Sequence, residues 1–241
     1  MGAQQQPERI VSLLTQHIVW VLLLLGVLGL ADTAGAAPKT AGRVLGALSF
    51  RGSLSALPQW KRVVREAPQE VSLLGNCNVG AQGCPDAATT WQALLEQGNG
   101  LSERQQLQKV NARLNRWPYR MDPEAYGVFD YWATPLEFLR QSGDCEDFCI
   151  VKYYALREMG FAAERLRIVV VRDTIRNVTH AVLRVQLADK AVILDNLSDL
   201  VVSQDKYGHY HPQYSVNEHY RWAHVIPRQH SPTSLSTLRP R

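Results

Sequence analysis

Residues 143–148 have the sequence GDCEDF, and this stretch decides where the central helix of the fold is expected to begin. Asp144 is a good N-cap residue, and Asp147 follows at the position of the second member of a capping box. The helix is therefore expected to start at Cys145. In the first turn of a helix, free N–H groups and the helix dipole favour a thiolate and can hold a developing oxyanion. Cys145 is therefore a candidate nucleophile.

Helix signals precede this stretch and strand signals follow it. Start and stop signals predict helices at about residues 58–66, 86–96, 102–117 and 134–143, and the central helix is expected to end at Gly160. After Gly160, alternating or continuous apolar runs predict strands at 166–171, 178–187, 191–194 and 220–225. Helices first and an antiparallel sheet second is an α+β arrangement.

A strand histidine and the aspartate that ends the next strand complete a candidate triad. A thiol nucleophile needs an imidazole base, and the base needs an orienting carboxylate. If the turn between the two strands is even, such as Ala188–Asp189, His180 lies opposite Leu197 and Asp195 is its diagonal neighbour on the same face. Such neighbours are about 7–8 Å apart, within reach of a His–Asp hydrogen bond. Taken alone, His180 would be interpreted as a half-buried structural histidine, and its conjunction with Cys145 and Asp195 favours the catalytic interpretation.

An apolar run near the N-terminus predicts export. Residues 18–30 are unbroken apolar, a polar start with Arg9 precedes them, and Ala34 and Ala36 follow at the spacing that signal peptidase requires. The run is shorter than the roughly 20 residues of a membrane span. Residues 1–36 are therefore predicted to be a cleaved signal peptide, with an uncleaved anchor as the alternative. Either way the rest of the chain is expected outside the cytoplasm.

The remaining cysteines have structural interpretations. Cys77 and Cys84 lie in a Gly- and Asn-rich loop that could close through a disulfide, which an exported protein can keep. A structural metal pair is the alternative, although no second CxxC or HxxH set stands nearby. Cys149, one turn after Cys145, is predicted to be a small core residue.

Length and charge limit the domain organisation and the partners. The chain has 241 residues, of which 46% are hydrophobic, enough for one substantial core. We expect a flexible lead-in at 37–56, one domain at 57–228 and a frayed tail at 229–241. The formal net charge is only +4, and the basic residues are spread along the chain without a long run. No nucleic-acid partner is therefore expected.

Six motifs carry a resemblance to a known family: DYWATPLEF (130–138), GDCEDF (143–148), KY (152–153), HAVL (180–183), LDNL (194–197) and YSVN (214–217). Together they resemble the bacterial transglutaminase-like cysteine proteinases over roughly residues 57–222. The resemblance implies a papain- or transglutaminase-like α+β fold. In that fold N-terminal helices, one of which carries the catalytic cysteine at its N-terminus, pack on an antiparallel sheet.

The same resemblance assigns roles to individual residues. It makes Cys145 the nucleophile, His180 the general base and Asp195 its orienting carboxylate, in agreement with the interpretation from the residues. It adds a Ca²⁺ site formed by Asp144, Glu146 and Asp147. Three carboxylates within four residues suit a hard, oxygen-liganded cation. The alternative is that Asp144 and Asp147 only cap the helix.

The best-understood members of the family suggest a substrate and a regulator. They are periplasmic, calcium-dependent proteases that cut a large biofilm adhesin near its N-terminus at a dialanine site. An inner-membrane receptor for cyclic di-GMP sequesters them through its periplasmic domain. The resemblance therefore implies a periplasmic location, an adhesin N-terminal region as substrate and such a receptor as partner. Acyl transfer by a transglutaminase or amidase, or a non-catalytic binding module, are the alternatives.

Overall fold

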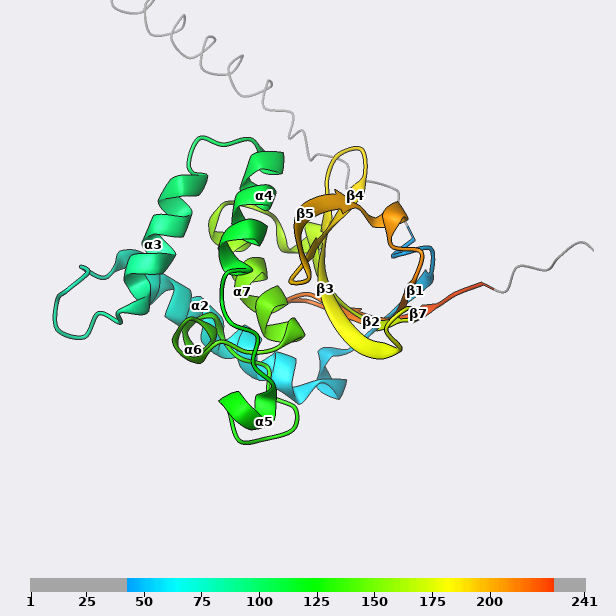
Figure 1. Cartoon of the computed structure of the whole chain (residues 1–241), viewed down its shortest axis with the longest axis horizontal. Coiled ribbons are helices and arrows are strands. Elements are labelled where there is room, and N and C mark those ends of the chain that lie inside the picture. Colours follow the sequence, from blue (N-terminus) through cyan, green and yellow to red (C-terminus); the bar gives the residue numbers. More distant parts are fainter. Residues whose placement is uncertain (1–42, 228–241) are drawn as a thin grey trace, which may run out of the picture. The chain divides into compact units, whose positions relative to one another are not determined.

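One antiparallel sheet forms one side of the structure, and the helices gather on the other side (Figure 1). The computed structural model describes residues 43–227. Within them the strand order is β1-β7-β6-β2-β3-β4-β5. The strands are β1 (Leu48–Gly52), β2 (Leu166–Asp173), β3 (Val178–Gln186), β4 (Ala191–Asp195), β5 (Ser198–Ser203), β6 (Tyr210–Val216) and β7 (Arg221–Val225).

Helix α7 is the centre of the helical side, because it packs against β2 and β3 and also against α2, α3, α4 and α6. The α-helices are α2 (Pro58–Asn76), α3 (Ala87–Gly98), α4 (Glu103–Leu114), α5 (Asp122–Ala125), α6 (Pro135–Gln141) and α7 (Cys145–Glu158). Short 3₁₀ turns lie at Leu54–Ala56, Ala163–Arg165 and Gln204–Lys206. The predicted α+β fold, with N-terminal helices packed on an antiparallel sheet, is confirmed.

Two apolar clusters lie on the two faces of the sheet. The main core contains the apolar faces of the helices together with residues of β2 and β3 such as Ile168, Ala181 and Leu183. Alternate residues of β2 and β3 belong to a smaller cluster, together with residues of β4, β6 and the segment before β1; its members are Val44, Val169, Val171, Val182, Ile193 and Tyr210. Alternation of side chains along a strand explains why successive residues fall into different clusters.

Helix α2 is longer than the sequence predicted. It runs ten residues beyond Glu66 to Asn76, and Pro68 lies inside it. Proline removes one backbone hydrogen bond and disfavours a helix interior. A stripe of apolar residues at helical spacing continues across that position, however, and is buried: Trp60, Val63, Ala67, Val71 and Leu74. Burial of this stripe against the core outweighs the local cost of Pro68.

Strands β1, β5 and β6 were not predicted, and β1 corrects the expected flexible lead-in at 37–56. Residues Leu48–Gly52 pair with β7, although every side chain of β1 is exposed, so its sequence shows no burial pattern. In β6, Pro212 pairs with Val171 where the register shifts. A proline usually argues against a strand but is tolerated at such an irregularity. The expected signal peptide at 1–36 and the tail at 229–241 lie outside the described residues.

The turn between β3 and β4 has the predicted even register. Leu183 pairs with Leu194 and Arg184 with Ile193, and the N–H of Leu187 donates to the carbonyl of Lys190 at 2.8 Å. This register places the end of β4 diagonally across from the start of β3 on the same face. The even turn on which the predicted approach of His180 and Asp195 depends is therefore present.

The structural cysteines behave as expected. Cys77 and Cys84 form a disulfide that closes the loop between α2 and α3. Cys149 is a free thiol in the main core, with only 2% of its surface exposed. Between residues 43 and 227 the structure contains no helix with both the length and the apolarity to cross a membrane.

Candidate active site

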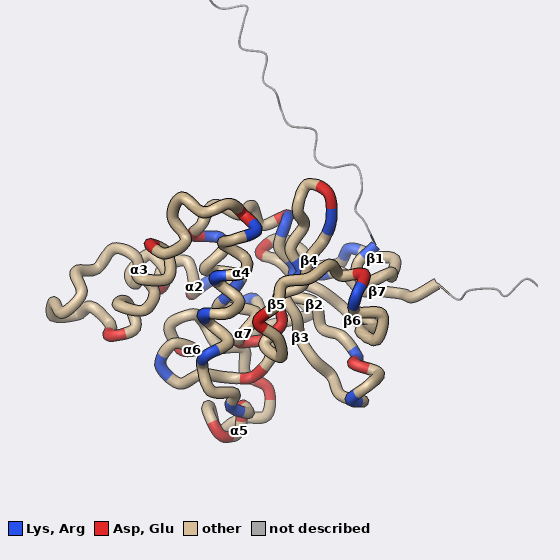
Figure 2. The backbone as a smooth tube through the Cα atoms, turned by 45° about the horizontal axis from the view of Figure 1, so that its top comes forward, with Lys and Arg blue, Asp and Glu red and all other residues tan. Residues whose placement is uncertain are grey.

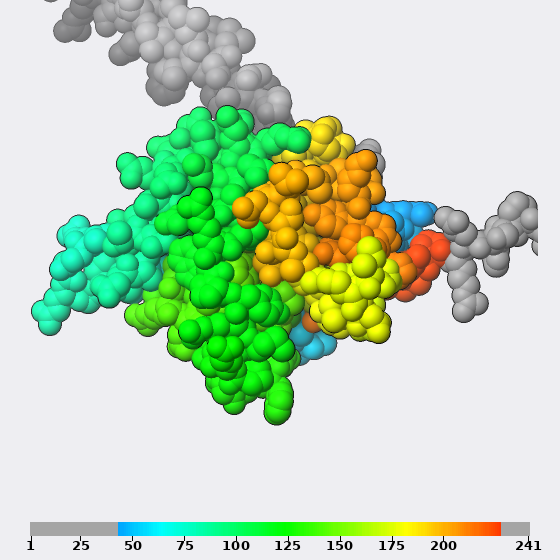
Figure 3. Space-filling model, viewed as in Figure 1, coloured from blue at the N-terminus to red at the C-terminus, as the bar shows by residue number. Residues whose placement is uncertain are grey.

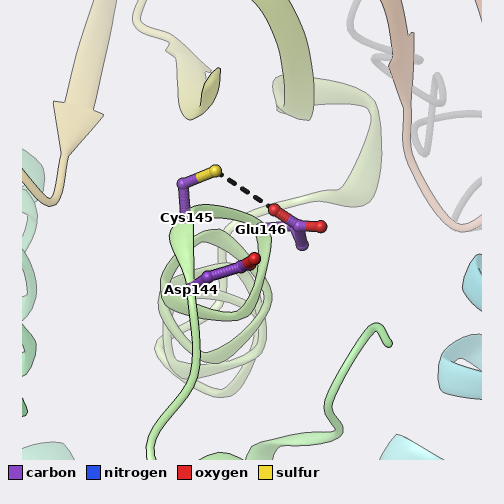
Figure 4. Close-up of side chains that lie close together, drawn as sticks. All are labelled: Asp144, Cys145 and Glu146. Atoms are coloured by element: carbon purple, nitrogen blue, oxygen red, sulfur yellow. Dashed lines mark hydrogen bonds between the residues drawn. The ribbon is translucent and has the colours of Figure 1, made fainter. Parts of the chain in front are cut away.

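Cys145 occupies the first position of α7, and a capping box fixes the residues around it. The side chain of Asp144 accepts from the backbone of Asp147, and the N–H of Asp144 donates to Oδ2 of Asp147 at 3.1 Å. A Cβ at Gly143 would collide with the carboxylate of Asp147, so only glycine fits before the cap. Sγ of Cys145 points out of the helix end and donates to Oε2 of Glu146 at 3.1 Å (Figure 4).

His180 and Asp195 form a buried hydrogen-bonded pair. Nε2 of His180 lies 2.9 Å from Oδ1 of Asp195, and the two residues are 4% and 2% exposed. Oδ1 also accepts from the N–H of Leu197 at 3.0 Å, and Oδ2 accepts from the hydroxyl of Tyr210 at 2.8 Å. Burial raises the pKa of Asp195, but the hydrogen bonds and the nearby imidazole outweigh it and leave this pKa below its ordinary value. The pair can orient an imidazole whose Nδ1 remains available.

The Cys145 thiol is not hydrogen-bonded to His180 in the described part of the chain. Successive side chains of β3 point to opposite faces of the sheet. Ala181 packs into the main core with α7, so the side chain of His180 lies on the other face. The structure thus forms the His180–Asp195 pair and the Cys145 helix end separately. The contact between Cys145 and His180 that a triad requires is therefore not formed among residues 43–227, and the triad stays a prediction.

The surroundings of Cys145 oppose the predicted thiolate. Burial raises the pKa of the Cys145 thiol well above its ordinary value, and the negative charges of Glu146 and Asp144 raise it further. The helix dipole favours a thiolate in this position, but adjacent carboxylates act against it.

Two further carboxylates join the predicted metal residues. Figure 2 shows acidic positions gathered between α5 and the start of α7. Carboxylate oxygens lie within 4.8 Å of one another in two sets, one of Asp122, Asp130 and Glu146 and one of Asp122, Asp144 and Asp147. We call these five residues the acidic cluster.

Asp122 and Asp130 come from residues 118–133 before α6, a segment that contains α5 and several aromatic residues and that we call the aromatic loop. Hydrogen bonds hold it to the turn before α7. The N–H of Arg120 donates to the carbonyl of Gly143 at 2.9 Å, and the hydroxyl of Tyr126 donates to the carbonyl of Ser142 at 2.7 Å. Ser142 has a positive φ of 66°, a conformation that non-glycine residues rarely adopt. No sequence motif points to Asp122 and Asp130, because these hydrogen bonds between distant segments bring them to the cysteine.

The acidic cluster has the chemistry of a site for a hard cation. Oδ1 of Asp144 and Oδ1 of Asp122 are buried without a hydrogen-bond partner among residues 43–227. Burial, together with charge repulsion within the cluster, raises the pKa of Asp122 to about 6 and also raises the pKa of Asp144, Glu146 and Asp147. Unsatisfied buried carboxylate oxygens close together fit an all-oxygen calcium site.

The five carboxylates are not equivalent. Both oxygens of Asp147 already accept backbone N–H groups, Oδ1 from Ala133 at 2.6 Å and Oδ2 from Asp144 at 3.1 Å. This arrangement fits the capping alternative for Asp147, whose contribution to a metal site stays a prediction. Asp144 and Asp122 retain the unpartnered oxygens that a cation would take.

The α+β fold, with Cys145 at the start of α7, has the arrangement expected of a transglutaminase-like protein, and comparison with known proteins identifies the family. The profile of the bacterial transglutaminase-like cysteine proteinases matches residues 66–230, so the chain belongs to this family. No curated protein gave a match.

Among solved structures, the chain is similar to LapG of Legionella pneumophila. The sequences are 29% identical, the TM-score is 0.53, and the match covers 65% of this chain and 87% of that protein. Its calcium-bound form matches with a TM-score of 0.54 over 72% of this chain and 93% of that protein, at the same identity.

Proposed function

We propose that this chain is a periplasmic, calcium-dependent cysteine endopeptidase that cuts a large surface adhesin near its N-terminus at a dialanine site. The observation that carries the proposal is the buried His180–Asp195 pair, whose Nε2–Oδ1 distance is 2.9 Å and whose position follows from the β3–β4 register. Family membership and the position of Cys145 at the start of α7 support the same chemistry.

In this proposal His180 takes the proton of Cys145 through Nδ1, since Nε2 is engaged by Asp195. Sγ then attacks the carbonyl carbon of the scissile peptide bond, and the backbone N–H groups at the start of α7 stabilise the resulting oxyanion. His180 returns the proton to the leaving amine as the C–N bond breaks. Water then hydrolyses the thioester, which releases the new carboxyl terminus and regenerates the thiol.

Asp144, Glu146 and Asp122 are the residues proposed to hold calcium, with Asp130 and Asp147 beside them. Calcium bound there supplies positive charge that offsets the repulsion among the carboxylates. The Glu146 carboxylate that accepts from Sγ belongs to this set, so Cys145 and the cation compete for it. The calcium-bound form of LapG supports the choice of ion.

The proposed physiological role follows the family resemblance. Cleavage would release the adhesin from the cell surface and promote biofilm dispersal. The periplasmic domain of an inner-membrane cyclic-di-GMP receptor would sequester the protease while the second messenger is abundant.

The test is cleavage of N-terminal fragments of candidate exported adhesins, followed by mass spectrometry of the products. We expect a single cut between small residues in the presence of calcium, and no cut with chelator. A parallel reaction contains a glutamine substrate and a labelled amine. Incorporation of the amine without cleavage would contradict the peptidase proposal in favour of acyl transfer, and no reaction in either assay would favour a binding module.

A further inference from the structure

A lysine ammonium is buried in the interior on the helix that begins with Cys145. Lys152 lies on α7 with none of its surface exposed, and it forms no ion pair with any carboxylate among residues 43–227. Burial lowers its pKa to about 8. A buried ammonium without a counter-ion is costly, so its surroundings must provide specific hydrogen bonds.

Two asparagine side chains, Asn111 of α4 and Asn115 directly after it, provide those hydrogen bonds. Nζ of Lys152 donates to Oδ1 of Asn111 at 2.8 Å and to Oδ1 of Asn115 at 2.6 Å. An ammonium can only donate, so both amides must turn their oxygen toward it. The Nδ2 groups of both asparagines are then directed away from Lys152.

The amide nitrogens hold the turn that follows the catalytic carboxylate. Nδ2 of Asn111 donates to the carbonyl of Ser198 at 2.8 Å. Nδ2 of Asn115 lies 3.0 Å from the carbonyls of both Asp195 and Ser198. Helix α4 lies directly beside β5, as Figure 3 shows, so this contact spans the boundary between the helical side and the sheet.

We infer that Lys152 is a positioning residue for the proposed peptidase reaction. Lys152 belongs to α7, the helix that begins with Cys145, and its hydrogen bonds run through α4 to the turn of Asp195. By fixing the orientation of Asn111 and Asn115, the ammonium fixes the backbone that carries Asp195. The distance between the nucleophile and the imidazole then depends on this network. The inference rests on the proposed function, because it concerns the same triad.

Two substitutions test the inference in different ways. Lys152→Met keeps most of the unbranched chain, ending one atom short of Nζ, but cannot select the orientation of the amides. Asn115→Asp keeps an acceptor for Lys152, and adds a charge that attracts it, but cannot donate to the carbonyls of Asp195 and Ser198. Gln108→Glu is the matched control, since Gln108 lies on the same helix and donates to the carbonyl of Asp199 without contacting Lys152.

The measurements are kcat and KM for adhesin cleavage, Tm, and hydrogen exchange of the Leu197 amide, which donates to Oδ1 of Asp195. We expect both test variants to lose about 10- to 100-fold in kcat, with KM within about twofold, because a misplaced catalytic group slows the chemical step. Exchange at Leu197 should accelerate in both variants and stay unchanged in Gln108→Glu.

Unchanged kcat and unchanged exchange at Leu197 in both variants would overturn the inference. A lowered Tm with unchanged kcat would also overturn it, because Lys152 would then be only a structural residue. If Lys152→Met does not fold, Asn115→Asp decides. If the wild type cleaves no adhesin, the proposed function fails, and exchange at Leu197 still decides whether this network holds the turn.

Discussion

The two parts of the site, the His180–Asp195 pair and the acidic cluster, differ in whether their buried carboxylate oxygens have hydrogen-bond partners. On the sheet, the Asp195 carboxylate accepts hydrogen bonds from His180, Leu197 and Tyr210, and its pKa is lowered. At the start of α7, by contrast, Asp144 and Asp122 each keep a buried oxygen without a partner, and their pKa values are raised.

This difference indicates that the fold completes one part of the site and that a cation completes the other. The fold itself completes the His180–Asp195 pair, so its geometry should not depend on calcium. The acidic cluster lacks positive charge, so the cation should affect the cysteine end of the site alone. Substitutions can break each part separately.

The largest effect is expected at the nucleophile. Cys145→Ala should lower the rate of adhesin cleavage by at least about 10⁴-fold, because no other group can form the thioester. Its Tm should stay close to that of the wild type, since the residue is only partly buried at a helix end. Cleavage assays and differential scanning calorimetry measure both quantities.

Cys149→Ala is the matched control. The Cys149 thiol is buried in the core and has no place in the mechanism, so this variant should lose a little stability and keep its activity. Full cleavage by Cys145→Ala would contradict the assignment of the nucleophile.

Substitutions of the sheet part should affect catalysis without affecting calcium. Asp195→Asn should lower kcat by roughly 10²- to 10⁴-fold, because the imidazole loses its orienting charge. Tyr210→Phe removes one hydrogen bond to the same carboxylate and should cost only about 2- to 10-fold. Calcium titrations followed by Tm should be unchanged in both variants. A weakened calcium response in Asp195→Asn would show that the two parts are not independent.

Substitution in the acidic cluster should have the opposite pattern. Glu146→Gln should weaken calcium binding at least about tenfold and reduce the calcium-induced rise in Tm. With chelator present it should raise Tm by a few degrees, because one of the mutually repelling buried carboxylates is gone. The exposed Glu124 on α5 supplies the control, Glu124→Gln, which should change neither quantity. Equal calcium affinities of wild type and Glu146→Gln would refute this account of the cluster.

The smallest predicted effect concerns a buried histidine on the sheet that belongs neither to the proposed triad nor to the acidic cluster. Burial, together with the charges of Arg167 and Arg184, lowers the pKa of His224 to about 4. Its unfolded pKa is about 6.5. The unfolded chain therefore binds the proton first, and stability is lost as pH falls from about 6.5 to about 4.

His224→Gln removes this titration. Between pH 6.5 and 4 the Tm of the wild type should fall a few degrees further than the Tm of the variant, as thermal unfolding would show. Parallel losses of Tm in the two proteins would mean that His224 titrates as an ordinary exposed histidine.

The parts of the site that depend on local rules were predictable from the sequence. The start of α7 follows from the capping pair of Asp144 and Asp147, which the structure contains as a reciprocal hydrogen-bonded box. The approach of Asp195 to His180 follows from side-chain alternation and an even turn.

Other features depend on contacts between distant segments. Asp122 joins Asp144 only because backbone and tyrosine hydrogen bonds hold the aromatic loop against the turn before α7. Strand β1 pairs with β7 while its side chains stay exposed, so its sequence has no apolar alternation that would predict a strand. The raised pKa of the Cys145 thiol does not follow from its position at the helix start, because burial and the carboxylates of Glu146 and Asp144 act against the helix dipole.

The most direct test of the central claim is the rate at which iodoacetamide alkylates Cys145 in the calcium-loaded protein at neutral pH, with the modified residue located by peptide mapping. If His180 activates the thiol, wild-type Cys145 should react at least about tenfold faster than Cys145 in His180→Ala, and faster than an ordinary exposed thiol. Equal rates in the wild type and His180→Ala would contradict the claim that these two residues act together.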